Sequence, residues 1–206
     1  MYKQGTYRLL SNKRLSATTF KMVLEGDTRY LTHSGQFVNV AVEGKYLRRP
    51  ISVCDYDDST ITLVYEIVGE GTRAMSLLRK GGKLDLLTGL GNGFDHTSDC
   101  RRPLLLGGGV GCAPLYNLAK QLLAEGREAV VILGFNTADD IVLADDFAEL
   151  GISTFIATVD GTCGVKGFVT DVIRKAKIDY DYFYACGPMP MLRALCMQLP
   201  CQGQVS

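Results

Sequence analysis

The chain has 206 residues, of which 47% are hydrophobic and 21% are charged, a composition typical of a soluble globular protein with one large or two small domains. Its 22 basic residues equal its 22 acidic residues, so it lacks the positive field of proteins that bind nucleic acid or anionic membranes. Apolar runs such as 129–135 are far shorter than the ~20 residues of a membrane span, and no secretory signal is visible. We therefore expect no nucleic-acid and no membrane partner.

Seven cysteines are dispersed along the chain, and no two of them form a C-x-x-C pair. The two that lie closest in sequence, Cys196 and Cys201, are five residues apart. Zinc and iron–sulfur sites usually bring thiolates together through short cysteine pairs, so the residues predict no metal site. Dispersed thiols are mostly small buried hydrophobes in a reducing compartment, which favours a cytoplasmic protein.

The first half of the chain is predicted to be an antiparallel β-barrel or sandwich. Short alternating stretches occur at 7–10, 18–24, 36–42, 51–54, 60–68 and 83–87. They are separated by turn clusters rich in Gly and Asp, as in all-β domains. One helical stretch, 73–79, interrupts the pattern.

The second half alternates strands and helices. Apolar strands are expected at 104–106, 129–133, 153–159 and 182–185, and helices at 113–124, 144–150, 168–176 and 188–198. Uniformly apolar strands separated by helices predict a doubly wound α/β domain, here with a five-stranded parallel sheet. There are 13 basic and 10 acidic residues before residue 99, and 9 basic and 12 acidic residues from there on. With the polar stretch 95–102 as a linker, this predicts two domains, at 1–98 and 99–206.

The strongest chemical signal is the glycine-rich turn GGGVGCAP at 107–114, between a predicted strand and a predicted helix. Glycines let the backbone approach a pyrophosphate, and a helix N-terminus offers free N–H groups. The spacing Gly109-x-Gly111-x-x-Pro114 departs from G-x-G-x-x-G, but proline suits the first turn of a helix. Such turns also serve tight strand–helix packing. The strand before and the helix after favour a nucleotide site.

A second turn, ACGPMPM at 185–191, follows the last predicted strand. The carboxyl ends of central strands form the ligand crevice of a doubly wound fold, and Cys186 lies at such an end. The alternative interpretation is a plain strand-to-helix turn with a buried thiol.

The barrel half carries a third set of residues, in the order Arg48-Arg49-Pro50-Ile51-Ser52, Val64-Tyr65-Glu66 and Gly69-Glu70-Gly71-Thr72-Arg73. An arginine fork can hold a diphosphate, and a hydroxyl at a strand end can donate to a ring nitrogen. Taken singly, each stretch is more typical of surface and turn chemistry. The informative feature is the order of the three stretches along the chain.

That order resembles the ferredoxin–NADP reductase superfamily over essentially the whole chain. There, R-x-[YFI]-[ST] and a G-x-G-T helix start bind FAD in a barrel, and GGGxGxAP and CGP bind a nicotinamide dinucleotide in the α/β domain that follows. Residues 49–52, 107–116 and 185–195 look most like the electron-transfer subunits of NAD-linked dihydroorotate dehydrogenases, and 160–162 with 167–171 add to the match.

The resemblance implies a role for each matched position. Arg49 would hold the FAD diphosphate, Ser52 would hydrogen-bond near flavin N5, and Cys186 would lie beside the nicotinamide. Ser52 and Cys186 are therefore the candidate catalytic residues. The candidate cofactor-binding residues are Arg49, Pro50, Ile51, Ser52, Val64, Tyr65, Glu66, Gly71, Thr72, Gly108, Gly109, Val110, Gly111, Asp160, Cys186, Gly187 and Pro188. Hydride transfer depends on ring alignment more than on an acid or base, so the cofactors carry the chemistry.

Two departures from the resembled subunits matter. Ile51 stands where the superfamily often has an aromatic residue stacked on the flavin, so an aliphatic side chain would take over that packing. The resembled subunits also continue into a cysteine-rich tail with a [2Fe-2S] cluster. This sequence ends at Ser206, about where that tail would begin, and Cys196 and Cys201 lack the cluster's spacing. We expect either a fragment or a version without the cluster.

The resemblance implies a flavoprotein that passes electrons from an FMN-containing dihydroorotate dehydrogenase catalytic subunit through FAD to NAD, in pyrimidine biosynthesis. A heterotetramer is the expected assembly. Residues 134–140 hold two acids and no base where a 2′-phosphate would need a cation, which favours NAD over NADP. Three alternatives stay open here: another NAD(P)H–ferredoxin-type reductase subunit, a regulatory nucleotide-binding module without flavin, or a subunit that only positions a partner.

Overall fold

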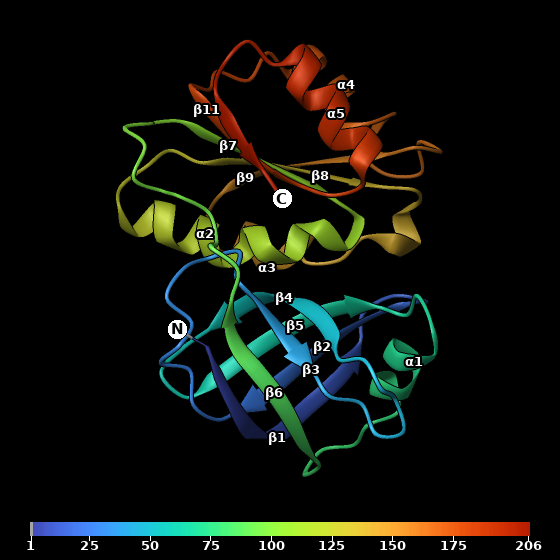
Figure 1. Cartoon of the computed structure of the whole chain (residues 1–206). Coiled ribbons are helices and arrows are strands. Elements are labelled where there is room, and N and C mark those ends of the chain that lie inside the picture. Colours follow the sequence, from blue (N-terminus) through green and yellow to red (C-terminus); the bar gives the residue numbers. More distant parts are fainter. Residues whose placement is uncertain (1) are drawn as a thin grey trace. The chain divides into compact units, whose positions relative to one another are not determined.

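The computed structural model describes residues 2–206, which form two compact units (Figure 1). The barrel unit ends at Gly93, and the sheet unit is Phe94–Ser206. The boundary predicted from the sequence lies five residues later. Residues 94–98 belong to the sheet unit because the Phe94 ring packs edge-on against Tyr184, with centroids 5.8 Å apart. The Tyr184 hydroxyl also donates to the Asp95 carbonyl at 3.1 Å.

Six antiparallel strands close the barrel in the order β1-β2-β5-β4-β3-β6. They are β1 (Lys3–Arg14), β2 (Thr19–Glu25), β3 (Phe37–Val40), β4 (Arg49–Tyr56), β5 (Thr60–Glu66) and β6 (Lys83–Leu90). Strand β1 pairs with both β2 and β6, so the ring has no free edge. Alternate side chains, such as Leu24, Val38 and Leu63, fill the interior and are fully buried.

The helix of the barrel unit is α1 (Glu70–Ser76), which begins three residues before the predicted stretch 73–79. Its first turn is held by Thr72, whose hydroxyl accepts the N–H of Val68 at 3.0 Å and donates to the Gly69 carbonyl at 3.2 Å. A side chain that satisfies backbone groups at this position fixes the start of a helix. The helix therefore begins inside the G-E-G-T motif itself.

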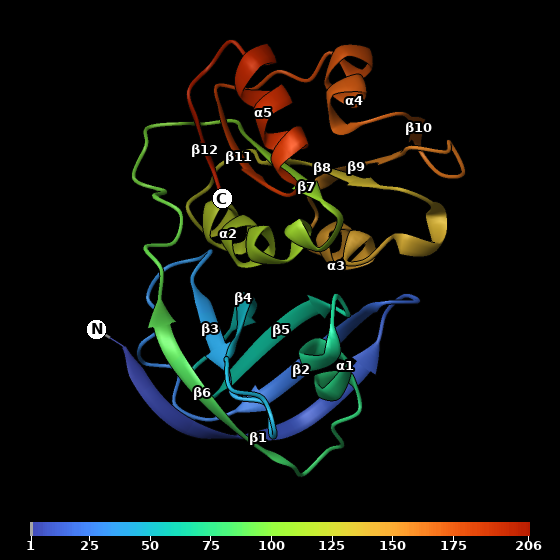
Figure 2. The same cartoon turned by 45° about the vertical axis from the view of Figure 1, so that its right-hand side comes forward.

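The sheet unit is a six-stranded sheet in the order β10-β9-β8-β7-β11-β12, in which every pair of neighbours is parallel. The strands are β7 (Pro103–Gly108), β8 (Val130–Phe135), β9 (Ser153–Thr158), β10 (Val165–Lys166), β11 (Tyr182–Cys186) and β12 (Gly203–Val205). Its helices are α2 (Ala113–Ala124), α3 (Ala144–Glu149), α4 (Val169–Ala176) and α5 (Met189–Gln198), with 3₁₀ turns η1 (Gly109–Cys112) and η2 (Ala138–Asp140). Helices α2 and α3 cover one face and α4 and α5 the other (Figure 2). The predicted doubly wound fold is thus confirmed.

The sheet has six strands where the sequence predicted five. The sequence pattern locates only four of these strands, and the two that it does not locate are the short edge strands, β10 with two residues and β12 with three. Neither is long enough to show an apolar pattern. The central strand β7, in contrast, is buried along its whole length, and its apolar run is visible in the sequence. No helix within residues 2–206 is long and apolar enough to cross a membrane.

Candidate functional site

Arg49 forms the centre of the candidate site in the barrel unit. It begins β4, and its guanidinium lies against Gly71 in the first turn of α1. A Cβ at position 71 would lie 2.6 Å from Arg49 Cζ, so this close approach requires glycine. The guanidinium donates to the Leu47 carbonyl, and no carboxylate in residues 2–206 pairs with it. A half-buried cation with unused N–H groups is suited to a diphosphate.

The neighbouring Arg48 is used differently. Its Nη1 donates to Asp85 Oδ1 at 2.9 Å and to the Asp85 carbonyl at 3.2 Å. The hydrogen bond from Arg48 holds the pKa of the Asp85 carboxyl below its ordinary value. Of the two adjacent arginines, Arg49 is the one left for an anionic ligand.

Ser52 and Ile51 follow Arg49 on β4. Ser52 is half-buried, and its hydroxyl has no hydrogen-bond partner within residues 2–206. A hydroxyl without a protein partner is compatible with the predicted donor role. Ile51 packs into the barrel core and is only 9% exposed, so it offers a ligand little of its surface. Pro50, between Arg49 and Ile51, is exposed.

The segment Val64–Glu66 of β5 runs beside these residues, because Val53 of β4 lies opposite Leu63 of β5 in antiparallel register. Val64 and Tyr65 are both 2% exposed. The Tyr65 ring stacks on Phe20, its hydroxyl donates to Asn12 Oδ1 at 3.1 Å, and burial raises the pKa of Tyr65 to about 12. Glu66 accepts a hydrogen bond from Thr18. This segment therefore offers mainly its backbone, and the Thr72 hydroxyl is likewise occupied within its own turn.

In the sheet unit, the two predicted motifs meet at the carboxyl edge of the sheet. Strands β7 and β11 are neighbours, with Gly107 opposite Cys186. A Cβ at Gly111 would lie 2.7 Å from the Cys186 carbonyl carbon, and one at Gly108 would lie 2.9 Å from Pro188 Cδ. A Cβ at Gly187 would lie 3.2 Å from Gly108 Cα. The two turns thus form one surface of closely packed backbone, with Gly109 and Val110 at its open side.

The two cysteines of these turns are neutral thiols. Burial raises the pKa of Cys186 to about 11 and that of Cys112 to about 12. Cys112 is fully buried, with Sγ 3.9 Å from the Val142 carbonyl. A nucleophilic cysteine needs a depressed pKa, so Cys186 can contact a ring as a thiol but is not poised for covalent chemistry.

Asp160 lies in the loop after β9, at the same edge of the sheet. Its Oδ1 accepts the hydroxyl of Thr162 at 2.7 Å and the Thr162 N–H at 3.0 Å, and these bonds lower its pKa. Thr162 in turn accepts the Ala138 N–H at 2.8 Å, which ties this loop to the one after β8. Asp160 thus lies at the same carboxyl edge of the sheet as the glycine turn, but its carboxylate is hydrogen-bonded within its own loop.

Sequence reasoning missed two side chains at this edge. The stem of Lys166 lies against Gly161, where a Cβ would be 3.0 Å from Lys166 Cγ. Met191 packs its sulfur against Gly108. Met191 lies within the predicted motif 185–191 and could have been found from it. Lys166 lies on a two-residue strand, and no pattern in the sequence places it beside Gly161.

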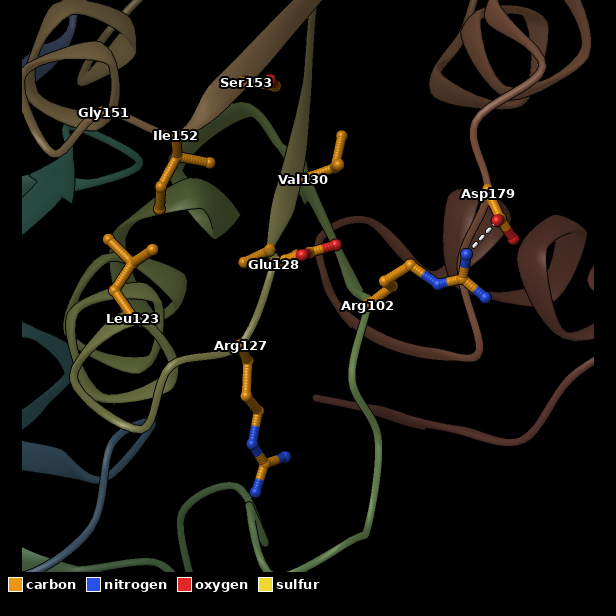
Figure 3. A pocket seen from close by; sticks show the side chains of 10 residues that line it. Arg102, Leu123, Arg127, Glu128, Val130, Gly151, Ile152, Ser153 and Asp179 are labelled. Atoms are coloured by element: carbon orange, nitrogen blue, oxygen red, sulfur yellow. Dashed lines mark hydrogen bonds and ion pairs between the residues drawn. The ribbon is translucent and has the colours of Figure 1, made fainter.

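A separate hollow of about 370 Å³ lies at the opposite, amino edge of the sheet (Figure 3). Leu123 and Ile152 form an apolar wall, and Arg102 pairs with Asp179 on another side. Ligands of doubly wound sheets bind beyond the carboxyl ends of the strands, so this hollow is not the candidate nucleotide site.

The cysteines and acids of residues 2–206 do not gather into a metal site. No group of three His, Cys, Asp or Glu side chains in this range could hold a metal ion. Cys196 is exposed on α5, and Cys201 follows the helix, partly buried.

Comparison with known proteins places these observations in a family context. A family model described as "Oxidoreductase NAD-binding domain" matches residues 105–197. The chain is 41% identical over 207 residues to the dihydroorotate dehydrogenase B (NAD(+)) electron transfer subunit of Fusobacterium nucleatum, covering 95% of this chain and 80% of that protein. It is 44% identical over 203 residues to the subunit of the same name from Bacillus mycoides, covering 95% of this chain and 78% of that protein.

Solved structures agree on the fold. The NADH-dependent reduced ferredoxin-NADP oxidoreductase matches with a TM-score of 0.86 at 27% identity, over 97% of this chain and 75% of that chain. A ferredoxin NADP+ reductase from Neisseria gonorrhoeae with bound FAD and NADP matches with a TM-score of 0.83 at 17% identity, over 99% of this chain and 98% of that chain. The latter likeness bears on the fold alone. The predicted barrel followed by a nucleotide-binding α/β unit is confirmed.

Proposed function

This chain belongs to the family of dihydroorotate dehydrogenase B (NAD(+)) electron transfer subunits, and we propose that it carries electrons from a dihydroorotate-oxidising catalytic subunit through FAD to NAD. It is an oxidoreductase subunit with a ferredoxin-reductase-like fold. The observation that carries the cofactor assignment is the Arg49 guanidinium, which rests on Gly71 without an acidic partner in residues 2–206.

The barrel unit is the proposed FAD site. Arg49 would bind the diphosphate through charge-assisted hydrogen bonds, and Gly71 leaves room for the guanidinium. The free Ser52 hydroxyl would donate to the flavin ring, and the Val64–Glu66 backbone would line it. Arg49 begins β4 and Gly71 lies in the first turn of α1, whereas Ser52 lies within β4, three residues after Arg49.

The carboxyl edge of the sheet unit is the proposed NAD site. The backbone at Gly108–Gly111 would lie along the pyrophosphate, and the neutral thiol of Cys186 with Gly187 and Pro188 would lie at the nicotinamide. When bound, the two cofactors supply the hydride and electron chemistry themselves. The protein's part is to bind and orient the rings and to offer uncharged surface around them.

A separate, FMN-containing catalytic subunit is the proposed partner, and a heterotetramer is the assembly we expect. The support is the name that the relatives share, which describes each as one subunit of a dehydrogenase. All seven cysteines are free thiols, which supports the proposed cytoplasmic location.

The test is to purify the chain and assay it alone and with a catalytic subunit of the same family. Alone, it should carry FAD and reduce a dye with NADH, but should not oxidise dihydroorotate. With the catalytic subunit and dihydroorotate, it should reduce NAD. A colourless protein would contradict the flavin assignment, and dihydroorotate oxidation by the chain alone would overturn its assignment as an electron-transfer subunit.

A further inference from the structure

Tyr46 is the most exposed large hydrophobic side chain in residues 2–206, with 98% of its surface accessible. It lies in the loop between β3 and β4, three residues before Arg49. Its ring makes no hydrogen bond or aromatic contact with another residue in that range. Tyrosine combines a large apolar ring with a polar hydroxyl, and it is enriched where a protein binds a partner.

The backbone on each side of Tyr46 is held in place. The Lys45 ammonium pairs with Glu70 in the first turn of α1, and the Leu47 carbonyl accepts a hydrogen bond from Arg49. The Lys45 N–H also donates to the Val42 carbonyl at 3.0 Å, which closes a turn. Tyr46 is thus fixed beside the Arg49–Gly71 contact, while its ring is left free.

We propose that Tyr46 positions the adenosine end of FAD by stacking its ring on the adenine, an inference that rests on the proposed FAD site. The diphosphate lies in the middle of a dinucleotide, so a flavin on one side of Arg49 requires adenosine on another. Ser52, the predicted flavin contact, follows Arg49 by three residues, and Tyr46 precedes it by three. The positive charge of Arg49 suits the diphosphate between them.

The loop holds features that suit an adenine rather than a large protein surface. Leu47 is 67% exposed and gives the purine a second apolar contact, whereas Arg49 and the Lys45–Glu70 pair surround the ring with polar groups. Any nucleobase can stack on an aromatic side chain, and removal of one such stack usually weakens binding roughly tenfold.

The experiment compares FAD with FMN, which has the same flavin and one phosphate but no adenosine. Wild type, Tyr46→Ala, Tyr46→Phe and the control Leu77→Ala are purified with bound flavin, and a sample of each is exchanged into FMN. Leu77 is also well exposed, at 75%, and follows the last residue of α1. Release of each flavin on dilution is followed by its fluorescence.

We expect Tyr46→Ala to weaken FAD binding about tenfold and to leave FMN binding unchanged, with Tyr46→Phe and Leu77→Ala close to wild type. Because the chain has no tryptophan, Tyr46→Trp adds a single indole and should bind FAD at least as tightly as wild type. Equal loss of FAD and FMN would show a structural role and overturn the proposal. Unchanged FAD binding with weaker assembly onto the catalytic subunit would overturn it in favour of a protein contact. Wild type that holds no FAD would instead refute the proposed function.

Discussion

The two candidate phosphate sites of this chain use different chemical groups, a cationic side chain in one and the backbone in the other. In the barrel unit, a cationic side chain, Arg49, rests on a glycine and has no acidic partner in residues 2–206. In the sheet unit, the surface at Gly108–Gly111 is made of backbone packed on the turn at Cys186 and Gly187. A charge-assisted hydrogen bond contributes about 1.5–3 kcal/mol and a neutral one about 0.5–1.5 kcal/mol.

This difference indicates which nucleotide should stay and which should exchange. A cation held beside a diphosphate suits a resident cofactor such as FAD. A neutral backbone surface binds less tightly, as a co-substrate that must leave after each turnover requires. The distinction also predicts that the barrel site is the more sensitive to salt, because screening acts on charge pairs.

The largest expected effect follows from adding one methyl group to the backbone surface. In Gly111→Ala the Cβ would meet the Cys186 backbone, which cannot move aside as a side chain can. We expect the free energy of unfolding to fall by about 1–3 kcal/mol and kcat/KM for NADH to fall roughly a hundredfold, with FAD still bound. Stopped-flow reduction by NADH and thermal unfolding measure both.

The matched control is Gly151→Asn. Gly151 has a φ of 78° with nothing within 4 Å of a Cβ, and asparagine tolerates this backbone conformation. It should keep NADH activity. If Gly111→Ala also keeps it, the backbone surface is not the NAD site.

The next effect concerns the cation of the barrel unit. Arg49→Ala should weaken FAD binding about tenfold or more, because it removes charge-assisted bonds. Gly71→Ala should also weaken it, since the added Cβ displaces the guanidinium, and the double variant should be no worse than Arg49→Ala alone. FAD titrations of the three variants test this non-additivity.

Arg48→Ala serves as the comparison variant, because Arg48 is bonded to Asp85. It should retain FAD better than Arg49→Ala does. The reverse ranking, or additive losses in the double variant, would reject the division of labour between the two arginines.

A smaller effect is expected for the choice between NADH and NADPH. Asp139 and Asp140 lie in the loop after β8, and Asp140 is already bonded to the Thr137 N–H at 3.2 Å. Repulsion between exposed like charges about 4 Å apart is about 1 kcal/mol in water, or roughly fivefold against NADPH. Steady-state rates decide it. Lys166→Ala tests the opposite possibility, that a cationic side chain binds the 2′-phosphate of NADPH. A selective loss of NADPH use in this variant would show that Lys166 does so.

The smallest effect is expected from pH. Burial raises the pKa of Cys186 to about 11, so its thiol stays protonated at neutral pH and Cys186→Ser should change the NADH rate little. Because the folded state favours the neutral thiol, the contribution of Cys186 to the free energy of unfolding is fully present below the ordinary thiol pKa. This contribution is lost as pH rises through about 11. At neutral pH, iodoacetamide should modify exposed Cys196 before Cys186, as mass spectrometry would show. Faster labelling of Cys186 would contradict its burial.

The sequence predicted those features that repeat along it. The uniform burial of β7 and the alternation in the barrel strands leave apolar periods, so the fold class and the glycine turn could be predicted. The helix α2 was predicted at its observed bounds, 113–124, because Pro114 and its apolar stripe mark it.

Features that depend on contacts distant in sequence could not be predicted. The unit boundary depends on Phe94 reaching Tyr184. The start of α1 is a different case, because the Thr72 hydroxyl accepts the N–H of Val68 only four residues away, and the apolar pattern does not register such a polar contact. Edge strands of two or three residues are held by their neighbours and have no pattern of their own. That Arg49 is free while Arg48 is paired follows only from the position of Asp85 on β6, which nothing in the local sequence reveals.

One anaerobic titration tests the contrast between a resident and an exchanging nucleotide most directly. The purified chain is passed over a desalting column and then titrated with NADH while the flavin absorbance is followed. We expect FAD to remain after desalting and to be bleached by about one NADH per flavin, because NADH donates two electrons and FAD accepts two. A protein that has lost its flavin on the column, or that keeps a flavin which NADH does not bleach, would contradict it.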